Sequence, residues 1–325
     1  MPFLLAHGGA QIQIEQTQTA LNAIGVQAEP LRWWDANQQG DLIHFFGRPS
    51  AIQIRLAHKK GMKVVIAELL TAQGSRKPAQ LRLQKLISRA VESVAPSSFT
   101  AAFNWDSYRN ADGMVANTAW EKHLMEYLFD ANPARTYVVP NGVEEVFFTS
   151  PTTTRGEWLV CTTTITERKR VLELAQAAVA ARTPVWIIGR PYAEDEPHAQ
   201  QFFALARQYH QFIRYEGGIS DRIRLAEIYR AARGFVLLSA METRSLSAEE
   251  AAACECPLLL SDLPWAHSTF GATATYCPVA NTTVTATALR KFHDAAPGLP
   301  RPNKPATWQE VARQFKSVFE RVLAA

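Results

Sequence analysis

Short apolar runs alternate along the chain with longer stretches in which apolar residues recur at helical spacing. Most of the runs are uninterrupted by polar residues, which predicts strands buried on both faces of parallel sheets. The predicted strands are Phe3–Ala6, Leu42–Phe46, Lys63–Ala67, Gly113–Ala116, Tyr137–Val139, Leu159–Thr162, Val185–Ile188, Phe212–Tyr215, Phe235–Leu238 and Pro257–Leu260. Strands that alternate with helices indicate an α/β protein.

The helical stretches between these strands are amphipathic. One predicted face contains Thr17, Ala20, Leu21 and Ile24, with Gly25 as the stop, and a second contains Val171, Leu174, Ala175, Ala178 and Val179. Thr118 and Glu121 have the spacing of a capping box before a helix over Trp120–Phe129. A last helix is predicted over Trp308–Leu323, after a segment rich in proline (Pro297–Pro305).

The strand and helix pattern runs twice, which predicts two doubly wound, Rossmann-like domains. A turn at Pro140-Asn141-Gly142 and a linker over Phe148–Gly156 separate the two sets. The 325 residues suffice for two cores. The expected domains are residues 1–147 and 156–305, and residues 306–325 form a helix that returns to the first domain. Ligands of such sheets bind at the carboxyl ends of strands, so the loops there are the places to search for function.

Composition and charge narrow the class of protein. The chain is 47% hydrophobic and 20% charged, as globular proteins are. Its net charge of +4 permits anionic partners without choosing one. The apolar start is too short for a signal peptide, and the stretch Ser268–Leu289 is too rich in threonine for a membrane span. A cytoplasmic protein is therefore expected, with its four cysteines (Cys161, Cys254, Cys256 and Cys277) reduced and no metal site.

The segment from Ser239 to Ala253 carries the most chemical information. It follows a predicted strand, opens a helix, and separates Glu242 from Glu250 by seven residues. Ser245 and Ser247 both suit an N-cap, and free N–H groups at a helix start can bind a diphosphate. A carboxylate can accept hydrogen bonds from both hydroxyls of a ribose. Equally, acids there can simply complement the helix dipole.

This segment resembles the Glu-x7-Glu motif of family-4 retaining glycosyltransferases, which have the GT-B fold. Further resemblances follow in the family's order along most of the chain. They are Gly8-Gly9, Asp41–Phe46, Ala111–Thr118, Val139–Val143, Glu167-Arg168-Lys169, Ile188-Gly189, Gly217-Gly218 and the helix Trp308–Leu323. The resemblance implies two Rossmann-like domains that face a central cleft, an acceptor domain first and a nucleotide-sugar domain second.

The resemblance also implies roles for single residues. Glu242 would contact the donor sugar, and Lys169 would neutralise the leaving phosphate, so both are the expected catalytic residues. Glu250 would hold the donor ribose. The other expected donor-binding residues are Arg244, Ser245, Leu246, Gly8, Gly9, Gly189, Gly218 and Ile219. The family's chemistry needs no metal and no cofactor, and the donor would be a UDP- or GDP-linked sugar.

The chain departs from the family pattern at several positions. Thr163 and Thr164 stand where the family has a glycine and an arginine, and Thr243-Arg244-Ser245 replaces Gly-Phe-Gly. We expect Arg244 to replace the missing arginine as a phosphate partner. Glu68 stands where many members have a histidine near the reacting sugar; it either orients the acceptor or is a plain loop acid. His44 lies inside a predicted strand and is expected in the core.

A basic segment, Arg76–Arg89, suggests a partner for the first domain. Arg82, Lys85 and Arg89 share one helical face, while apolar residues (Leu83, Leu86, Ile87, Ala90 and Val94) line another. The segment either docks peripherally on anionic lipid at the inner face of the membrane or packs against the sheet with its cations in solvent.

The resulting expectation is a retaining, metal-independent, hexosyltransferase-like enzyme. It would transfer a sugar from a nucleotide diphosphate to a glycan or lipid-linked acceptor, in glycan or cell-envelope polysaccharide assembly. Two alternatives stay open: a phosphorylase or epimerase of the same fold, and a non-catalytic protein that binds nucleotide sugars or glycans. A nicotinamide dehydrogenase is disfavoured because no Gly-x-Gly-x-x-Gly follows a strand. Nucleic acid is not an expected partner, because the basic segment lacks interleaved aromatic residues.

Overall fold

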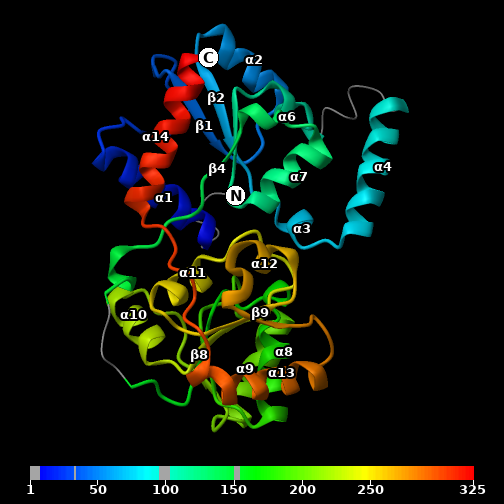
Figure 1. Cartoon of the computed structure of the whole chain (residues 1–325), viewed down its shortest axis with the longest axis vertical. Coiled ribbons are helices and arrows are strands. Elements are labelled where there is room, and N and C mark those ends of the chain that lie inside the picture. The colour runs from blue at the N-terminus through cyan, green and yellow to red at the C-terminus, as the bar shows by residue number, and fades with distance from the viewer. Residues whose placement is uncertain (1–7, 33, 95–102, 150–153) are drawn as a thin grey trace. The chain divides into compact units, whose positions relative to one another are not determined.

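The computed structural model describes residues 8–32, 34–94, 103–149 and 154–325 (Figure 1). These residues fall into two compact units. The N-terminal unit comprises the described residues of 12–142 together with 308–325. The C-terminal unit comprises residues 8–11 and the described residues of 143–307. Each unit is built on one parallel sheet, so the α/β class expected from the sequence is confirmed.

The sheet of the N-terminal unit has the order β1-β2-β3-β4 within the described residues. The strands are β1 (Leu42–Phe46), β2 (Lys63–Ala67), β3 (Gly113–Ala116) and β4 (Thr136–Val138). Its helices are α1 (Gly9–Ala23, the first three residues grouping with the other unit), α2 (Ala51–Lys59), α3 (Thr71–Gly74), α4 (Pro78–Val94), α6 (Asp106–Asn110), α7 (Ala119–Phe129) and α14 (Trp308–Ala324). The predicted strand Phe3–Ala6 lies outside the described residues.

Helix α14 packs on this sheet because one of its faces is apolar. Its buried side chains are Trp308, Val311, Ala312, Phe315, Val318 and Val322. The Phe315 ring lies 5.1 Å from the His44 ring on β1. At the start of the helix, a methyl group on Gly142 would stand 2.6 Å from the Trp308 Cα, so only glycine allows this close approach.

The sheet of the C-terminal unit has the order β10-β9-β8-β5-β6-β7. The strands are β5 (Leu159–Thr162), β6 (Val185–Ile188), β7 (Ile213–Tyr215), β8 (Gly234–Leu237), β9 (Leu258–Ser261) and β10 (Thr275–Cys277). The helices are α8 (Val171–Ala181), α9 (Pro197–Gln208), α10 (Arg222–Ala231), α11 (Leu246–Ala253), α12 (Pro264–Phe270) and α13 (Thr282–Ala295). The chain order reverses between β5 and β8, which is the switch point where such sheets bind ligands.

The hydrophobic pattern located the described strands of both sheets, except β10, to within one residue. Four strands begin or end one residue from the predicted positions: β4, β7, β8 and β9. Strand β10 was not predicted, because Thr275-Tyr276-Cys277 is short and only partly buried. The capping box at Thr118 forms only in half. Thr118 accepts a hydrogen bond from the Glu121 N–H, but the Glu121 carboxylate accepts from the N–H groups of Asn117 and Leu70.

The division between the units follows packing rather than the polar linker. The sequence places the boundary after residue 147, whereas contacts group residues 143–149 with the C-terminal unit. The side chain of Phe147 is fully buried in the core of that unit. Val143 forms a backbone bridge with Thr307 in the same unit.

Candidate functional site

The switch point of the six-stranded sheet brings two loops together. The loop after β5 continues into a short 3-10 turn, η4 (Glu167–Lys169), and the loop after β8 leads into α11. The Ala240 N–H donates to the Arg168 carbonyl over 2.8 Å, and Arg168 Nη1 donates to the Met241 carbonyl over 2.7 Å. These hydrogen bonds tie the two loops together.

Lys169 and Glu242 form an ion pair at this junction. The Lys169 Nζ contacts the Glu242 Oε1, and the Arg168 Nη1 lies 3.3 Å from the same oxygen. The side chains of Lys169 and Glu242 are 13% and 9% exposed, so little water screens them. The structure thus unites the two residues that the sequence proposes as catalytic, and adds Arg168 beside them.

Glu250, in the middle of α11, belongs to a second buried network. Arg222 Nη2 donates to the Glu250 Oε1 over 2.5 Å, and the Tyr229 hydroxyl donates to the Oε2 over 3.2 Å. Burial raises the pKa of Glu250, while the Arg222 charge and hydrogen bond oppose this rise. Arg222 also contacts Glu144 (2.6 Å from Nε to Oε2), so one guanidinium bridges two carboxylates.

The start of α11 is capped and carries a third ion pair. Ser245 is the N-cap: its hydroxyl accepts from the Ala248 N–H over 3.3 Å. Ser247, the other N-cap candidate, lies within the helix. Arg244 Nε donates to the Glu249 Oε1 over 2.6 Å. Burial raises the pKa of Glu249, and the charge of Arg244 counters this rise. Arg244 therefore balances a buried acid, whatever else it contacts.

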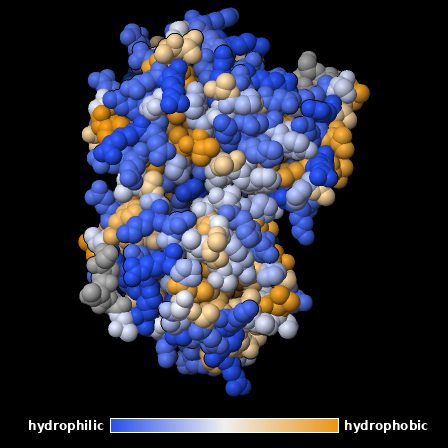
Figure 2. Space-filling model, in the orientation of Figure 1, coloured by the Kyte–Doolittle hydropathy of each residue, from blue (hydrophilic) through white to orange (hydrophobic). Residues whose placement is uncertain are grey.

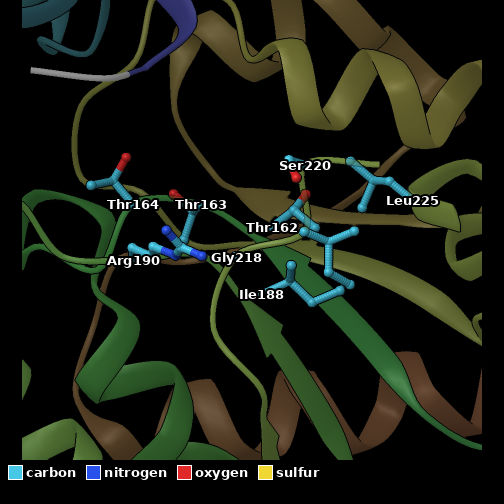
Figure 3. A pocket seen from close by; sticks show the side chains of 10 residues that line it. Thr162, Thr163, Thr164, Ile188, Arg190, Gly218, Ser220 and Leu225 are labelled. Carbon is cyan, nitrogen blue, oxygen red and sulfur yellow. The ribbon is translucent and has the colours of Figure 1, made fainter. Parts of the chain in front are cut away.

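A cavity of about 310 Å³ opens at the carboxyl ends of β5 and β6 (Figure 3). Its lining residues are Thr162, Thr163, Thr164, Ile188, Gly189, Arg190, Gly218, Ile219, Ser220 and Leu225. In this view Arg190 and Thr164 lie at one side, and Leu225 lies at the other. Thr162 and Ser220 lie near Leu225 in the same view, so the lining there is mixed polar and apolar. The exposed Arg190 guanidinium forms no ion pair or hydrogen bond with any described residue.

Gly189 allows the two strand ends of the cavity to approach. Its φ is +153°, and a methyl group there would stand 1.8 Å from the Thr163 carbonyl oxygen. Thr163 and Gly189 are further joined through the Ile188 carbonyl, which accepts from the Thr163 N–H over 3.0 Å. Any side chain at Gly189 would therefore push apart the floor of the cavity.

The remaining predicted site residues all lie in the C-terminal unit. Gly189, Gly218 and Ile219 line the cavity, and Leu246 begins α11. Gly8 and Gly9 group with the C-terminal unit, and Gly9 is the first residue of α1. The sequence did not single out Arg190, Arg222, Tyr229 or Glu144 as site residues. A buried carboxylate at Glu250 does require a partner, but residue spacing does not identify which arginine or tyrosine supplies it.

Two residues of the N-terminal unit have structural partners. Glu68 accepts from Arg48 Nη2 over 2.6 Å and from the Tyr108 hydroxyl, so it is fixed after β2. His44 packs its ring against Phe46 and the α14 phenylalanines, and burial lowers its pKa to about 3. His44 is thus the core residue that the sequence predicts.

No group of three His, Cys, Asp or Glu side chains suited to a metal occurs among the described residues. The four cysteines are buried thiols, and burial raises the pKa of Cys161, Cys254 and Cys256 to about 12. None of the helices in the described ranges combines the length and apolarity that a membrane crossing requires.

Several known proteins are similar to this chain in sequence or in fold. No family model matches the chain. A D-inositol 3-phosphate glycosyltransferase from Jonesia denitrificans is 27% identical over 249 residues, which are 65% of this chain and 57% of that protein. The chain thus spans little more than half of that curated relative. Sucrose-phosphate synthase from Thermosynechococcus elongatus superposes with a TM-score of 0.69 at 17% identity, over 98% of this chain and 94% of that one. Anabaena HepE, solved in complex with UDP, superposes with a TM-score of 0.60 at 13% identity, over 96% and 82%.

Proposed function

Because the chain has the GT-B fold of these proteins, we propose that it is a retaining glycosyltransferase. It transfers a sugar, of hexose type, from a nucleotide diphosphate to an acceptor in glycan or cell-envelope polysaccharide assembly. The C-terminal unit is its donor domain and the N-terminal unit its acceptor domain. The similarity to a curated glycosyltransferase supports the activity, and the resemblance to family 4 suggests the retention of configuration.

The observation that carries this proposal is the Lys169–Glu242 pair at the switch point of the sheet. When the bond between the sugar and the diphosphate breaks, negative charge develops on the leaving phosphate. A lysine held in a shielded place stabilises that charge without a metal ion. Glu242 orients Lys169 before the donor binds and then accepts hydrogen bonds from the donor sugar. Both are the proposed catalytic residues.

The cavity beside this pair suits the nucleoside end of a donor. Gly189, Gly218 and Ile219 offer backbone that a flat base can approach closely. Arg190 supplies a planar cation that can stack on the base. Glu250 retains lone pairs beyond those used by Arg222 and Tyr229, and in this proposal they accept the ribose hydroxyls. Since a structural neighbour binds UDP, the expected donor is a UDP- or GDP-linked sugar.

The first turn of α11 would receive the diphosphate. The N–H groups at a helix start lack partners within the helix, so Ser245 and Leu246 can donate them to phosphate oxygens. Arg244 stays a proposed phosphate partner even though it already binds Glu249. Gly8 and Gly9 remain proposed phosphate contacts through their backbone. The acceptor is a glycan or a lipid-linked sugar, and the enzyme acts in the cytoplasm or at its membrane.

A second candidate is a nucleotide-sugar-binding protein of the same fold without transferase activity. It is favoured by one feature: every acid of the site already has a cation inside the protein. Lys169 matches Glu242, Arg222 matches Glu250, and Arg244 matches Glu249. Such closed pairs suit a binding site whose charges never act on a reacting bond.

Turnover of candidate donors tests the proposal. The purified chain is incubated with UDP- and GDP-sugars, with and without sugar acceptors, and released nucleotide and products are measured. We expect release with one donor, loss of it in Lys169→Ala, and no loss in the matched control Lys291→Ala on α13. The anomeric configuration of the product, measured by NMR, tests retention. Tight donor binding without release would favour the second candidate. If the chain neither binds a donor nor releases nucleotide, both candidate functions are contradicted.

A further inference from the structure

Arg222, the first residue of α10, is held in place from several sides. Its Nε donates to the Glu144 Oε2 over 2.6 Å, and its Nη2 lies 2.5 Å from an oxygen of Glu144 and from an oxygen of Glu250. The guanidinium carbon lies 4.7 Å from the centre of the Phe147 ring, in a cation–π contact. Asp221, whose side chain accepts from two backbone N–H groups, caps the helix just before Arg222. The position of this guanidinium is therefore fixed.

Glu250 lies where a carboxylate needs a nearby positive charge to stay ionised. Its side chain is 8% exposed, and burial raises its pKa. The charged and titratable groups that face it are Arg222 and Tyr229 from α10, Glu144 from the segment after β4, and Cys254 at the end of α11. Among these neighbours Arg222 supplies the positive charge, whereas Glu144 adds a second negative charge and raises the pKa of Glu250 further.

Tyr229 connects Glu250 to the cavity. Its hydroxyl donates to the Glu250 Oε2 over 3.2 Å and also forms a hydrogen bond with Thr162, which lines the cavity (Figure 3). Burial and the charge of Glu250 raise the pKa of Tyr229 well above its usual value, so the hydroxyl keeps its proton and donates it to the carboxylate. A carboxylate has about four lone-pair positions, of which Arg222 and Tyr229 use two, so about two remain for the hydroxyls of a ribose.

We propose that Arg222 is a positioning residue of the donor site. It keeps the Glu250 carboxylate ionised and oriented for the ribose hydroxyls, and so sets the lowest pH at which a nucleotide binds. Hydrogen bonds to an ionised carboxylate are roughly twice as strong as hydrogen bonds between neutral groups. Arg222 acts through Glu250 and needs no contact with the nucleotide. The inference rests on the proposed function, because it takes Glu250 as the acceptor of the ribose hydroxyls.

Calorimetric titration with UDP and GDP, from acidic to mildly alkaline pH, tests this role. Arg222→Met removes the cation, so the pKa of Glu250 rises further, and the Kd should increase about tenfold for each pH unit below that pKa. Wild type should show the same loss only at lower pH. Arg222→Lys keeps a positive charge but lacks the planar fork that serves two carboxylates. It should therefore keep the pH profile of wild type, with a loss of affinity that is the same at every pH.

Two further variants separate the charge of Arg222 from the packing of its helix. Arg224→Met is the matched control, because Arg224 lies on the same helix, is 58% exposed and stands 3.9 Å from Glu216. Figure 2 shows mainly hydrophilic side chains over the part of the C-terminal unit where Figure 1 places α10. This control should bind as wild type does at every pH. Glu144→Gln removes a negative charge beside Glu250, so binding should extend to lower pH.

The outcomes distinguish the role of Arg222 from the proposed function. Thermal unfolding without nucleotide shows whether each variant is folded. If wild type binds one nucleotide and the Kd of Arg222→Met runs parallel to that of wild type at every pH, the role of Arg222 is overturned and the proposed function stands. A shift of binding to higher pH in both Arg222→Met and Glu144→Gln would also overturn it, because the two charges must act with opposite sign. If wild type binds neither nucleotide at any pH, the proposed donor site is contradicted, and the role of Arg222 with it.

Discussion

The carboxyl edges of the two sheets both hold buried acids, but they use them differently. In the N-terminal unit, Glu68 binds Arg48 and Tyr108, and Glu121 accepts two backbone N–H groups. These contacts join one loop to the next. In the C-terminal unit, Glu242 pairs with Lys169, and Glu250 pairs with Arg222.

The difference shows that a partnered buried acid is not by itself a functional one. Glu121 satisfies backbone donors that would otherwise be buried without partners, so its role is fully explained by folding. Glu242 accepts hydrogen bonds from two side-chain cations, Arg168 and Lys169, and a ligand can take the place of Glu242 on either cation. The cavity, where Arg190 has no ion-pair partner among the described residues, gives that ligand a place.

The largest effect is expected at Lys169. Lys169→Ala should lower donor turnover by about 10²–10³-fold, because it removes a preorganised charge from the leaving phosphate. Steady-state kinetics with the nucleotide sugar that the chain turns over measure this loss. Lys122→Ala in the N-terminal unit, where Lys122 lies 3.8 Å from Glu126, serves as the control and should leave turnover unchanged. Equal turnover in wild type and Lys169→Ala would remove the central catalytic role from the site.

The next effect concerns the floor of the cavity. Gly189→Ala should lower the free energy of unfolding by about 3 kcal/mol or more, because its methyl group would overlap the Thr163 carbonyl. Gly217→Ala is the matched control. Gly217 also has a positive φ, of +82°, but a methyl group there meets no atom within 4 Å, so only about 1 kcal/mol of backbone strain is expected. Urea unfolding of the two variants measures both, and equal losses would contradict the close approach.

A pair of acid-to-amide variants compares the two sheets directly. Glu68→Gln should lower the free energy of unfolding by about 2 kcal/mol, because the partly buried Arg48 loses its counter-charge, and it should leave nucleotide affinity unchanged. Glu242→Gln should also cost stability, since the Lys169 side chain is only 13% exposed, but unlike Glu68→Gln it should reduce donor turnover. Urea unfolding and kinetics on the same preparations test this. A reversed pattern would exchange the roles of the two acids.

The smallest effect is one of pH. Burial raises the pKa of Glu250, so this group contributes stability below its unfolded pKa of 4.5, and that contribution is lost as pH rises through the folded pKa. Wild type should thus lose stability relative to Glu250→Gln as the pH rises above 4.5.

Asp112 in the N-terminal unit should show the opposite sign. Burial acts to raise its pKa, but hydrogen bonds from the Val64 N–H and His58 outweigh burial, and the pKa is lowered. Its contribution is present above the unfolded pKa of 3.8 and is lost as pH falls through the folded pKa. Unfolding curves of Asp112→Asn should therefore approach those of wild type as the pH falls, and parallel curves would contradict this.

The sequence predicted the strands well because most of them are continuous apolar runs, and burial of such runs does not depend on distant partners. It missed β10, whose tyrosine is only partly buried. Local spacing and family resemblance led to the prediction of Lys169, Glu242 and Glu250 as site residues. It could not predict that Arg222 bridges Glu144 and Glu250, because those residues are 78 and 28 positions away from it. It also left open which face of α4 packs against the N-terminal unit. Amphipathic spacing defines the apolar face of a helix but does not show what that face contacts.

Nucleotide binding tests the central claim most directly. Thermal unfolding of wild type, Glu250→Ala and Glu68→Ala is followed with UDP, GDP and their sugar conjugates. At a ligand concentration of 100 times Kd, binding stabilises the folded state by about 2.7 kcal/mol and raises its Tm. The account predicts a rise for wild type and Glu68→Ala with one base, and its loss in Glu250→Ala. No rise with any nucleotide, or an equal rise in all three proteins, would contradict a donor site at the switch point of the C-terminal unit.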